Sequence, residues 1–194
     1  MKVCDSAMGS GSLLAAALRY LTEALFESLY YHGRIAAHGD GGIVRLADGQ
    51  LTNDVLTESL SVPPDHPDFD DRLRARLKRY VVERCIYGVD LDPLAVGIAR
   101  IAPALAWDDF DIGKWTYRLQ VGNALIGATQ AGRSDNAPAQ WRPFDWSAAF
   151  PDVFGGVDRG FDAVVGNPPY VSFGLRDLRN IDRELADAYR RRYP

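Results

Sequence analysis

The chain has 194 residues, 47% of them hydrophobic and 25% charged, which suits one globular domain or most of one. Its net charge of −4 argues against a stand-alone nucleic-acid-binding protein, because such proteins usually present a basic face. Two cysteines are too few for a disulfide framework, and we expect a cytoplasmic protein with reduced thiols, no signal peptide and no membrane span. The three histidines have no cysteine or carboxylate at ligand spacing, so we expect no metal site.

The first 31 residues predict a strand, a turn and a helix. Residues 2–5 are strand-like, residues 6–11 are a turn of small side chains, and leucines recur every three or four residues over 12–31. This succession is the opening of a nucleotide-binding α/β unit. Only four residues precede Asp5, so we expect the chain to be a piece of a larger protein.

The next segment, residues 33–80, interrupts this pattern. Turn-forming residues predict a small hairpin over 42–52, centred on Asp48 and Gly49. A charged helix is expected to follow over 70–84. We interpret residues 33–80 as an insertion after the first helix.

A second strand and helix follow. Residues 85–91 are mostly apolar and include β-branched side chains, which indicates a core strand. Asp92 suits the N-cap of the next helix and Pro93 its first turn, while Pro103 is expected to disturb its later part. Residues 117–125 predict a third strand with a turn at Gly122 and Asn123.

The last third of the chain is less regular. Residues 127–160 are rich in Gly, Pro, Asp and Ser and predict an irregular loop. Five aromatic residues within it are expected to anchor it: Trp141, Phe144, Trp146, Phe150 and Phe154. Residues 161–166 predict a fourth strand, and residues 179–192 an Arg-rich helix.

Alternating strands and helices predict an α/β fold with a partial parallel sheet of about four strands, flanked by helices and joined by right-handed crossovers. Ligands of such sheets bind at the carboxyl ends of the strands. Each unusual turn of this sequence follows such an end: residues 5–11, Asp90, Asn123 and residues 167–170. Their expected convergence on one edge is the main reason to place a site there.

The turn after the first strand contains Gly9 and Gly11, which can adopt positive φ or let the backbone approach a ligand closely. It leads into a helix N-terminus, which favours an anionic group. The spacing is neither Gly-x-Gly-x-x-Gly, because residue 14 is leucine, nor a P-loop, because Gly-Lys-Ser/Thr is missing. NAD and ATP are therefore not the expected ligands, and a purely structural turn remains an alternative.

The second and third strands each end in a polar residue. Asp90 lies where an acid commonly holds a ribose diol. Asp92 competes for that role but is already explained as a helix cap, and a solvated loop acid is the other interpretation of Asp90. The amide of Asn123 could contact an adenine edge, or it could simply form a turn after Gly122.

The fourth strand runs into Asn167, two prolines and Tyr170. The prolines lack backbone donors and make a stiff segment whose carbonyls have fixed directions. Asn167 adds an amide carbonyl that can accept an N–H, and Tyr170 adds a flat face for stacking. Together they could hold a planar group with an exocyclic amine, and acceptors on both of its hydrogens would help the nitrogen attack an electrophile. A surface turn is the alternative.

Four segments in this order carry a resemblance: DSAMGSGSLL, YGVDLDPLAV, VGNALIG and FDAVVGNPPYV. Together they resemble the S-adenosylmethionine-dependent DNA adenine N6-methyltransferases, and most of all the large ones of type IIG restriction–modification and BREX phage-defence proteins. FDWSAAFPDVF, shortly before the last segment, is also similar to that subgroup. The resemblance implies a Rossmann-like class I methyltransferase fold, S-adenosylmethionine as cofactor, and double-stranded DNA with a flipped adenine as partner.

The resemblance also implies roles for individual residues. At the cofactor it places Asp5, Ala7, Gly9, Gly11, Asp90, Leu91, Asn123 and Ala124. At the target base it places Asn167, Pro168, Pro169 and Tyr170, with Asn167 and the Pro168 carbonyl accepting the amine hydrogens and Tyr170 stacking on the base.

The sequence departs from this family in several ways. Asn123 stands where the family usually has an acid, and Ser6-Ala7-Met8 stands where it often has Pro-Ala-Cys. The remaining strands and the target-recognition domain are expected outside this chain, so the chain alone is expected to be weakly active or inactive. Two other interpretations stay open: a glutamine N5-methyltransferase of release factors, and a non-catalytic cofactor-binding fragment.

Overall fold

A computed structural model describes residues 1–47, 55–106, 115–127, 141–157 and 159–167, together with Asp187 and Arg190. Its helices and strands are β1 (Val3–Asp5), α1 (Ser12–Tyr31), β2 (Ile35–His38), β3 (Gly41–Ala47), β4 (Val55–Leu60), α2 (Phe69–Arg84), β5 (Ile86–Asp90), α3 (Pro93–Ala106), β6 (Leu119–Val121), β7 (Asn123–Gly127), β8 (Pro143–Phe144), α5 (Trp146–Ala149), α6 (Pro151–Phe154) and β9 (Ala163–Val165).

The centre of the fold is a four-stranded sheet with the order β6-β5-β1-β9. All of its pairings are parallel, and Asp5 is in register with Gly88 on one side and with Val165 on the other. This confirms the prediction of an α/β fold with a parallel sheet of about four strands. Along the chain, β5 and then β6 are added on one side of β1, and the last strand, β9, pairs with β1 on its other side.

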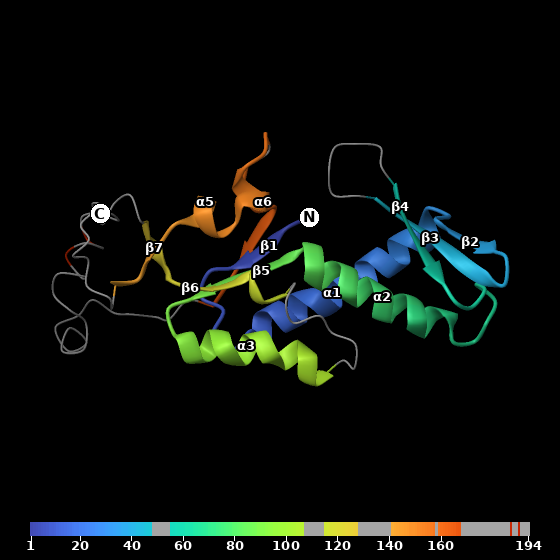
Figure 1. Ribbon diagram of the computed structural model, residues 1–194, viewed down its shortest axis with the longest axis horizontal. Helices are drawn as coiled ribbons and strands as arrows, with labels where there is room; N and C mark the ends of the chain where they lie inside the picture. The colour runs from blue at the N-terminus through green and yellow to red at the C-terminus, as the bar shows by residue number, and fades with distance from the viewer. Residues whose placement is uncertain are drawn as a thin grey trace.

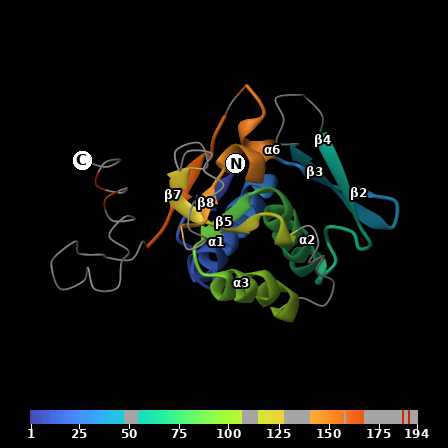
Figure 2. The ribbon, with the colours of Figure 1, turned by 60° about the vertical axis from the view of Figure 1, so that its left-hand side comes forward.

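Each face of this sheet has its own apolar core, because successive residues of a strand point to opposite faces. Ile86 of β5 joins the cluster formed with α1, α2 and α3, whereas Tyr87 and Val89 join an aromatic cluster with Phe150. Figures 1 and 2 accordingly show α3 and the start of α1 on one side of the sheet, and α6 on the other.

Helix α1 begins and ends where the leucine periodicity predicts. Its most buried stripe is Leu14, Leu18, Thr22, Phe26 and Leu29. Thr22 is tolerated in this stripe because its hydroxyl donates a hydrogen bond to the carbonyl of Leu18 (2.8 Å). Helix α2 has acidic residues in its first turn and Arg84 in its last, which suits the helix dipole.

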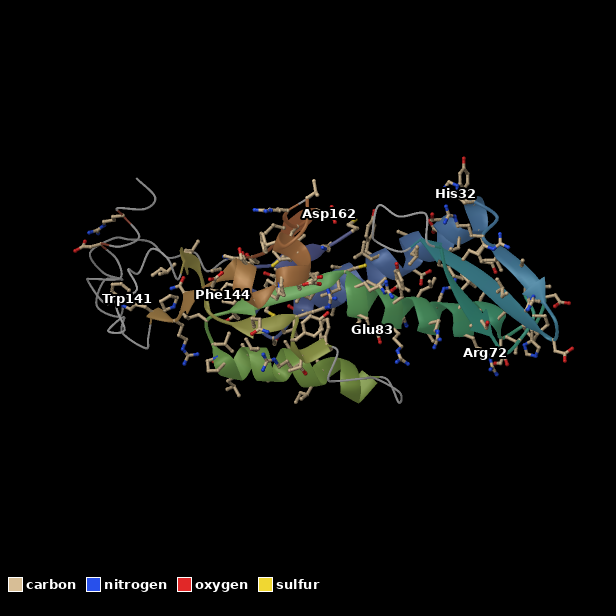
Figure 3. All side chains as sticks on the ribbon, turned by 45° about the horizontal axis from the view of Figure 1, so that its top comes forward. His32, Arg72, Glu83, Trp141, Phe144 and Asp162 are labelled. Carbon is tan, nitrogen blue, oxygen red and sulfur yellow. The ribbon has the colours of Figure 1, made fainter. Side chains whose placement is uncertain are left out.

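A second sheet, antiparallel with the order β2-β3-β4, lies at the far end of α1 and α2. Its core includes Phe26 and Leu29 of α1, Val44 of β3, and Phe69 and Leu73 of α2. Because α1 has 20 residues, it separates this sheet from the start of the helix by about 30 Å. In Figure 3, His32 and Arg72 accordingly lie at one end of the molecule and Trp141 and Phe144 at the other.

Several local predictions need correction. Strand β2 was not expected, because two of its four residues are alanines, which have low strand propensity. The hairpin is longer than predicted, since β4 begins only at Val55, and its predicted turn lies outside the described residues. Helix α3 continues through Pro103. The predicted helix over 179–192 lies outside the described residues apart from Asp187 and Arg190.

The predicted third strand is in fact two strands. Residues of β6 belong to the main sheet, whereas β7 pairs with β8 in a separate two-stranded sheet. The expected irregular loop over 127–160 also contains β8, α5 and α6. Composition concealed these short elements because their stability comes from tertiary packing. Phe144 and Phe150 are buried, and their rings lie 5.9 Å apart.

Both cysteines are free thiols. Burial raises the pKa of Cys4 to about 12 and also raises the pKa of Cys85, so neither is a ready thiolate. None of the helices in the described ranges combines the length and the apolar character needed to cross a lipid bilayer.

Candidate active site at the carboxyl edge of the sheet

The carboxyl ends of the four parallel strands bring the predicted polar residues to one edge. Asp5 ends β1 and Asp90 ends β5, while Asn123 follows β6 after one residue and Asn167 follows β9 after one residue. Strand order reverses at β1, and in open α/β sheets ligands bind in the crevice at such a reversal. The topology therefore places the candidate site over the end of β1.

The glycine turn is tied directly to the end of β5. The backbone N–H of Gly9 donates to Oδ2 of Asp90 at 2.7 Å, a bond between residues 81 positions apart. Next to it, the N–H of Met8 donates to the carbonyl of Val89 (3.1 Å). Gly9 has φ +54°, and no atom lies within 4 Å of the place where a Cβ would be. Gly9 thus combines a left-handed conformation with open space beside it.

Gly11 has a different role from Gly9. Its φ is +86°, and a Cβ on it would come within 3.3 Å of the Cβ of Ala99. Gly11 therefore lets the start of α1 approach α3 closely. Met8, immediately before Gly9, is 3% exposed and packs over Gly88, where an added Cβ would lie only 2.3 Å from the Met8 sulfur.

The hydrogen bonds of Asp90 and Asp92 give these two acids different roles. Oδ1 of Asp92 accepts the N–H of Leu94 (2.9 Å), which makes Asp92 the helix cap that the sequence predicts. Oδ1 of Asp90 accepts the N–H of Asp92 (2.9 Å), and its other oxygen holds Gly9. Asp90 therefore joins the two turns that flank the candidate site, and each of its oxygens has a second lone pair.

Asp5 is an unusual carboxyl group because it is only 1% exposed. Burial raises its pKa, the hydrogen bond from the N–H of Ala7 (3.0 Å) lowers it, and the nearby charge of Asp90 raises it further. The residue after β9 also lies next to Asp5, since a Cβ on Gly166 would lie 3.4 Å from Oδ1 of Asp5. Two carboxyl groups, Asp5 and Asp90, and two glycines, Gly9 and Gly166, thus lie around the carboxyl end of β1.

Asn123 and Ala124 lie where β6 passes into β7. Asn123 is 4% exposed, and its Oδ1 accepts the N–H of Leu125 (3.1 Å), which is a turn-forming bond. The carbonyl of Ala124 accepts a hydrogen bond from Nε1 of Trp146 (3.4 Å). Leu91, just beyond Asp90, keeps 45% of its surface exposed, so an apolar side chain stands open at this edge.

Asn167 is exposed and follows β9 beside the end of β1. The other three residues predicted at the target base, Pro168, Pro169 and Tyr170, lie outside the described residues, so their roles stay predictions.

Sequence reasoning missed Arg142. Its side chain donates to the carbonyl of Leu91 (3.1 Å), and its own carbonyl accepts the N–H of Asn123 (2.8 Å). An arginine before a proline in a Gly- and Pro-rich segment gave no signal, because only the tertiary fold brings residues 91, 123 and 142 together. Gly166 was missed for the same reason.

A cavity of about 330 Å³ lies elsewhere, between α1 and α3. It is lined by Ser10, Gly11, Leu14, Ala15, Leu18, Arg19, Lys78, Ala99, Ala102 and Trp115. Although it begins near the glycine turn, it runs along the helical face and includes neither Asp90 nor Asn167. We therefore place the candidate site at the sheet edge, where the polar groups converge, rather than in this cavity.

Comparison with known proteins identifies the family. The sequence model of the Eco57I restriction-modification methylase family matches residues 84–193. The match includes Asp90, Asn123 and residues 167–170, but it begins after the glycine turn, which the fold brings to Asp90. No curated protein matched the chain. Because the family match covers more than half of the 194 residues, the chain belongs to the Eco57I restriction-modification methylase family.

Proposed function

We propose that this chain carries the catalytic site of a DNA adenine-N6 methyltransferase that uses S-adenosylmethionine within a restriction–modification system. The observation that carries the proposal is the bond between Gly9 and Asp90 at the end of β1, beside Asn167. This bond joins the glycine turn, which has open space at Gly9, to Asp90, an acid suited to holding a ribose. Asn167, beside them, is an acceptor suited to an amine. The methylase family of the chain supports the reaction class.

The residues at the edge fit the proposed cofactor in three respects. Open space at Gly9 would admit the part of the cofactor that lies closest to the backbone. The second lone pairs on the Asp90 oxygens would accept the two ribose hydroxyls, because one N–H already occupies each oxygen. The exposed side chain of Leu91 offers an apolar surface to a flat ring. When bound, S-adenosylmethionine would supply an electrophilic methyl group, whose C–S bond breaks as the new C–N bond forms.

Asn167 is proposed to accept one hydrogen of the target amine through its side-chain carbonyl. The carbonyl of Pro168 would accept the other hydrogen, and Tyr170 would stack on the flipped base. Acceptors on both hydrogens favour the form of the amine in which the nitrogen lone pair is available for attack. A proton then leaves the nitrogen after transfer. Rate enhancement of this kind comes from positioning and electrostatics.

The experiment compares Asn167→Ala with wild type in the natural full-length protein. Methyl transfer from tritiated cofactor to duplex DNA is measured, and binding of S-adenosylhomocysteine is measured by calorimetry. We expect transfer to fall by a factor of about 100 or more, which is typical for loss of one preorganised hydrogen-bonding group, while binding is unchanged. Arg159→Ala is the control, because Arg159 is exposed and precedes β9 at the opposite end of that strand.

Three outcomes would overturn the proposal or a part of it. Full activity of Asn167→Ala would remove Asn167 from the catalytic residues. Methyl transfer to a duplex made only of G·C pairs would show that adenine is not the target base. Methylation of protein glutamine without DNA methylation would favour the release-factor alternative.

A further inference from the structure

Arg142 has an unusual backbone conformation. Among the described residues it is the one non-glycine residue with positive φ, at +39°. Positive φ is unfavourable for a residue with a Cβ, and a residue before a proline normally has an extended conformation. Such a conformation persists only where the surroundings impose it, and it is found most often at functional sites.

The surroundings of Arg142 hold it in place from two directions. Downstream, Phe144 is 6% exposed and lies so close to β6 that a Cβ on Gly122 would be 2.3 Å from its ring. On the other side, the carbonyl of Arg142 accepts the N–H of Asn123 (2.8 Å). The backbone of Arg142 is therefore fixed by β7 and by the aromatic cluster together.

With its backbone fixed, the Arg142 side chain reaches the turn after β5. Nη1 donates to the carbonyl of Leu91 (3.1 Å). One residue therefore joins the turn that contains Leu91 to the turn that contains Asn123. Leu91 is the residue proposed to offer an apolar surface to a flat ring of the cofactor, and the family resemblance places Asn123 at the cofactor as well. These two turns would therefore flank the adenine ring of the cofactor.

We propose that Arg142 is a positioning residue that sets the spacing between Leu91 and Asn123, and with it the fit of the adenine slot. This inference rests on the proposed function. The side chain acts through the Leu91 carbonyl and does not itself touch the reacting atoms. A guanidinium suits this task because its hydrogen bond to a carbonyl is charge-assisted and its planar fork is rigid.

Three substitutions separate the side chain from the backbone conformation. Arg142→Ala removes the guanidinium and keeps the unfavourable φ. Arg142→Gly removes the guanidinium and relieves the unfavourable φ, so it is expected to melt at a higher temperature than the alanine variant. Arg142→Lys retains a charged donor at a similar reach. Arg159→Ala serves as the control for loss of a surface arginine.

Calorimetry with S-adenosylhomocysteine and with adenosine gives the decisive measurement. Both ligands are expected to bind about tenfold more weakly to the alanine and glycine variants, the usual effect of losing one charge-assisted hydrogen bond. The lysine variant is expected to recover part of the loss. Equal binding losses in two variants that melt at different temperatures would distinguish positioning from general stabilisation.

The outcomes distinguish the two proposals. Wild-type protein that binds S-adenosylhomocysteine, with the alanine variant binding it equally well, overturns the role of Arg142 and leaves the proposed function intact. Binding losses that follow the melting temperature, with no recovery by lysine, also overturn it. Wild-type protein that binds neither ligand overturns the proposed function and this inference with it.

Discussion

The sharpest test of the site replaces Asp90 with its uncharged isostere. In wild type, one carboxylate oxygen accepts the N–H of Gly9 (2.7 Å) and the other accepts the N–H of Asp92 (2.9 Å). Asparagine has only one acceptor oxygen, and its NH₂ group would face a second N–H donor. Asp90→Asn can therefore keep one of the two turns in place but not both.

The expected magnitude follows from the lost bond. A hydrogen bond to a charged group contributes about 1.5–3 kcal/mol. Asp90 is partly exposed, so solvent screening reduces the loss in folding free energy to about 1–2 kcal/mol. Relief of the repulsion with Asp5 offsets part of this loss. Cofactor affinity is expected to fall more, by roughly 10- to 100-fold, because the ribose also loses an acceptor.

The matched control is Asp92→Asn, the same change two residues away. Asparagine caps helices about as well as aspartate, so folding free energy should change by less than about 0.5 kcal/mol. Urea denaturation measures the stability of both variants, and calorimetry with S-adenosylhomocysteine measures affinity. Equal affinity of the Asp90 and Asp92 variants would refute the assignment of Asp90 to the ribose.

Further predictions concern Asp5 and the two glycines. The folded protein holds the Asp5 proton more tightly than the unfolded chain does, so wild-type stability falls as pH rises from 3.8 through the raised pKa. Asp5→Asn removes this dependence, and its melting temperature relative to wild type should therefore rise with pH across that window; a constant difference would contradict this. Gly9→Ala and Gly11→Ala should each lose about 1–2 kcal/mol in urea denaturation, because both positions have positive φ. Only Gly9→Ala should also weaken S-adenosylhomocysteine binding, because its Cβ enters the open space whereas that of Gly11 meets Ala99.

The smaller sheet lies far from the candidate site. Strands β2, β3 and β4 lie at the end of α1 that is remote from Gly9 and Asp90. Since α1 spans about 30 Å, the smaller sheet lies well away from the carboxyl edge of the main sheet. The prediction that residues 33–80 form an insertion is compatible with this separation and stays a prediction.

Local patterns predicted the elements whose stability is encoded locally. The leucine spacing gave the bounds of α1, and Asp92 followed by Pro93 gave the start of α3, because periodicity and capping depend on residues within one turn of each other. The split between β6 and β7 was not predictable in this way. It depends on Phe144, more than 20 residues later, packing against Gly122.

The sequence by itself determined the chemical character of the candidate site: a glycine turn, an acid after the second strand, and Asn-Pro-Pro-Tyr after the fourth. Only the tertiary structure decided how these residues meet. It separated Gly9, with open space, from Gly11, which packs on Ala99, and it brought Arg142 to Leu91 and Asn123. The physical reason is that residue type fixes which bonds a side chain can form, whereas a contact between residues 81 positions apart exists only once the strands have paired into the sheet.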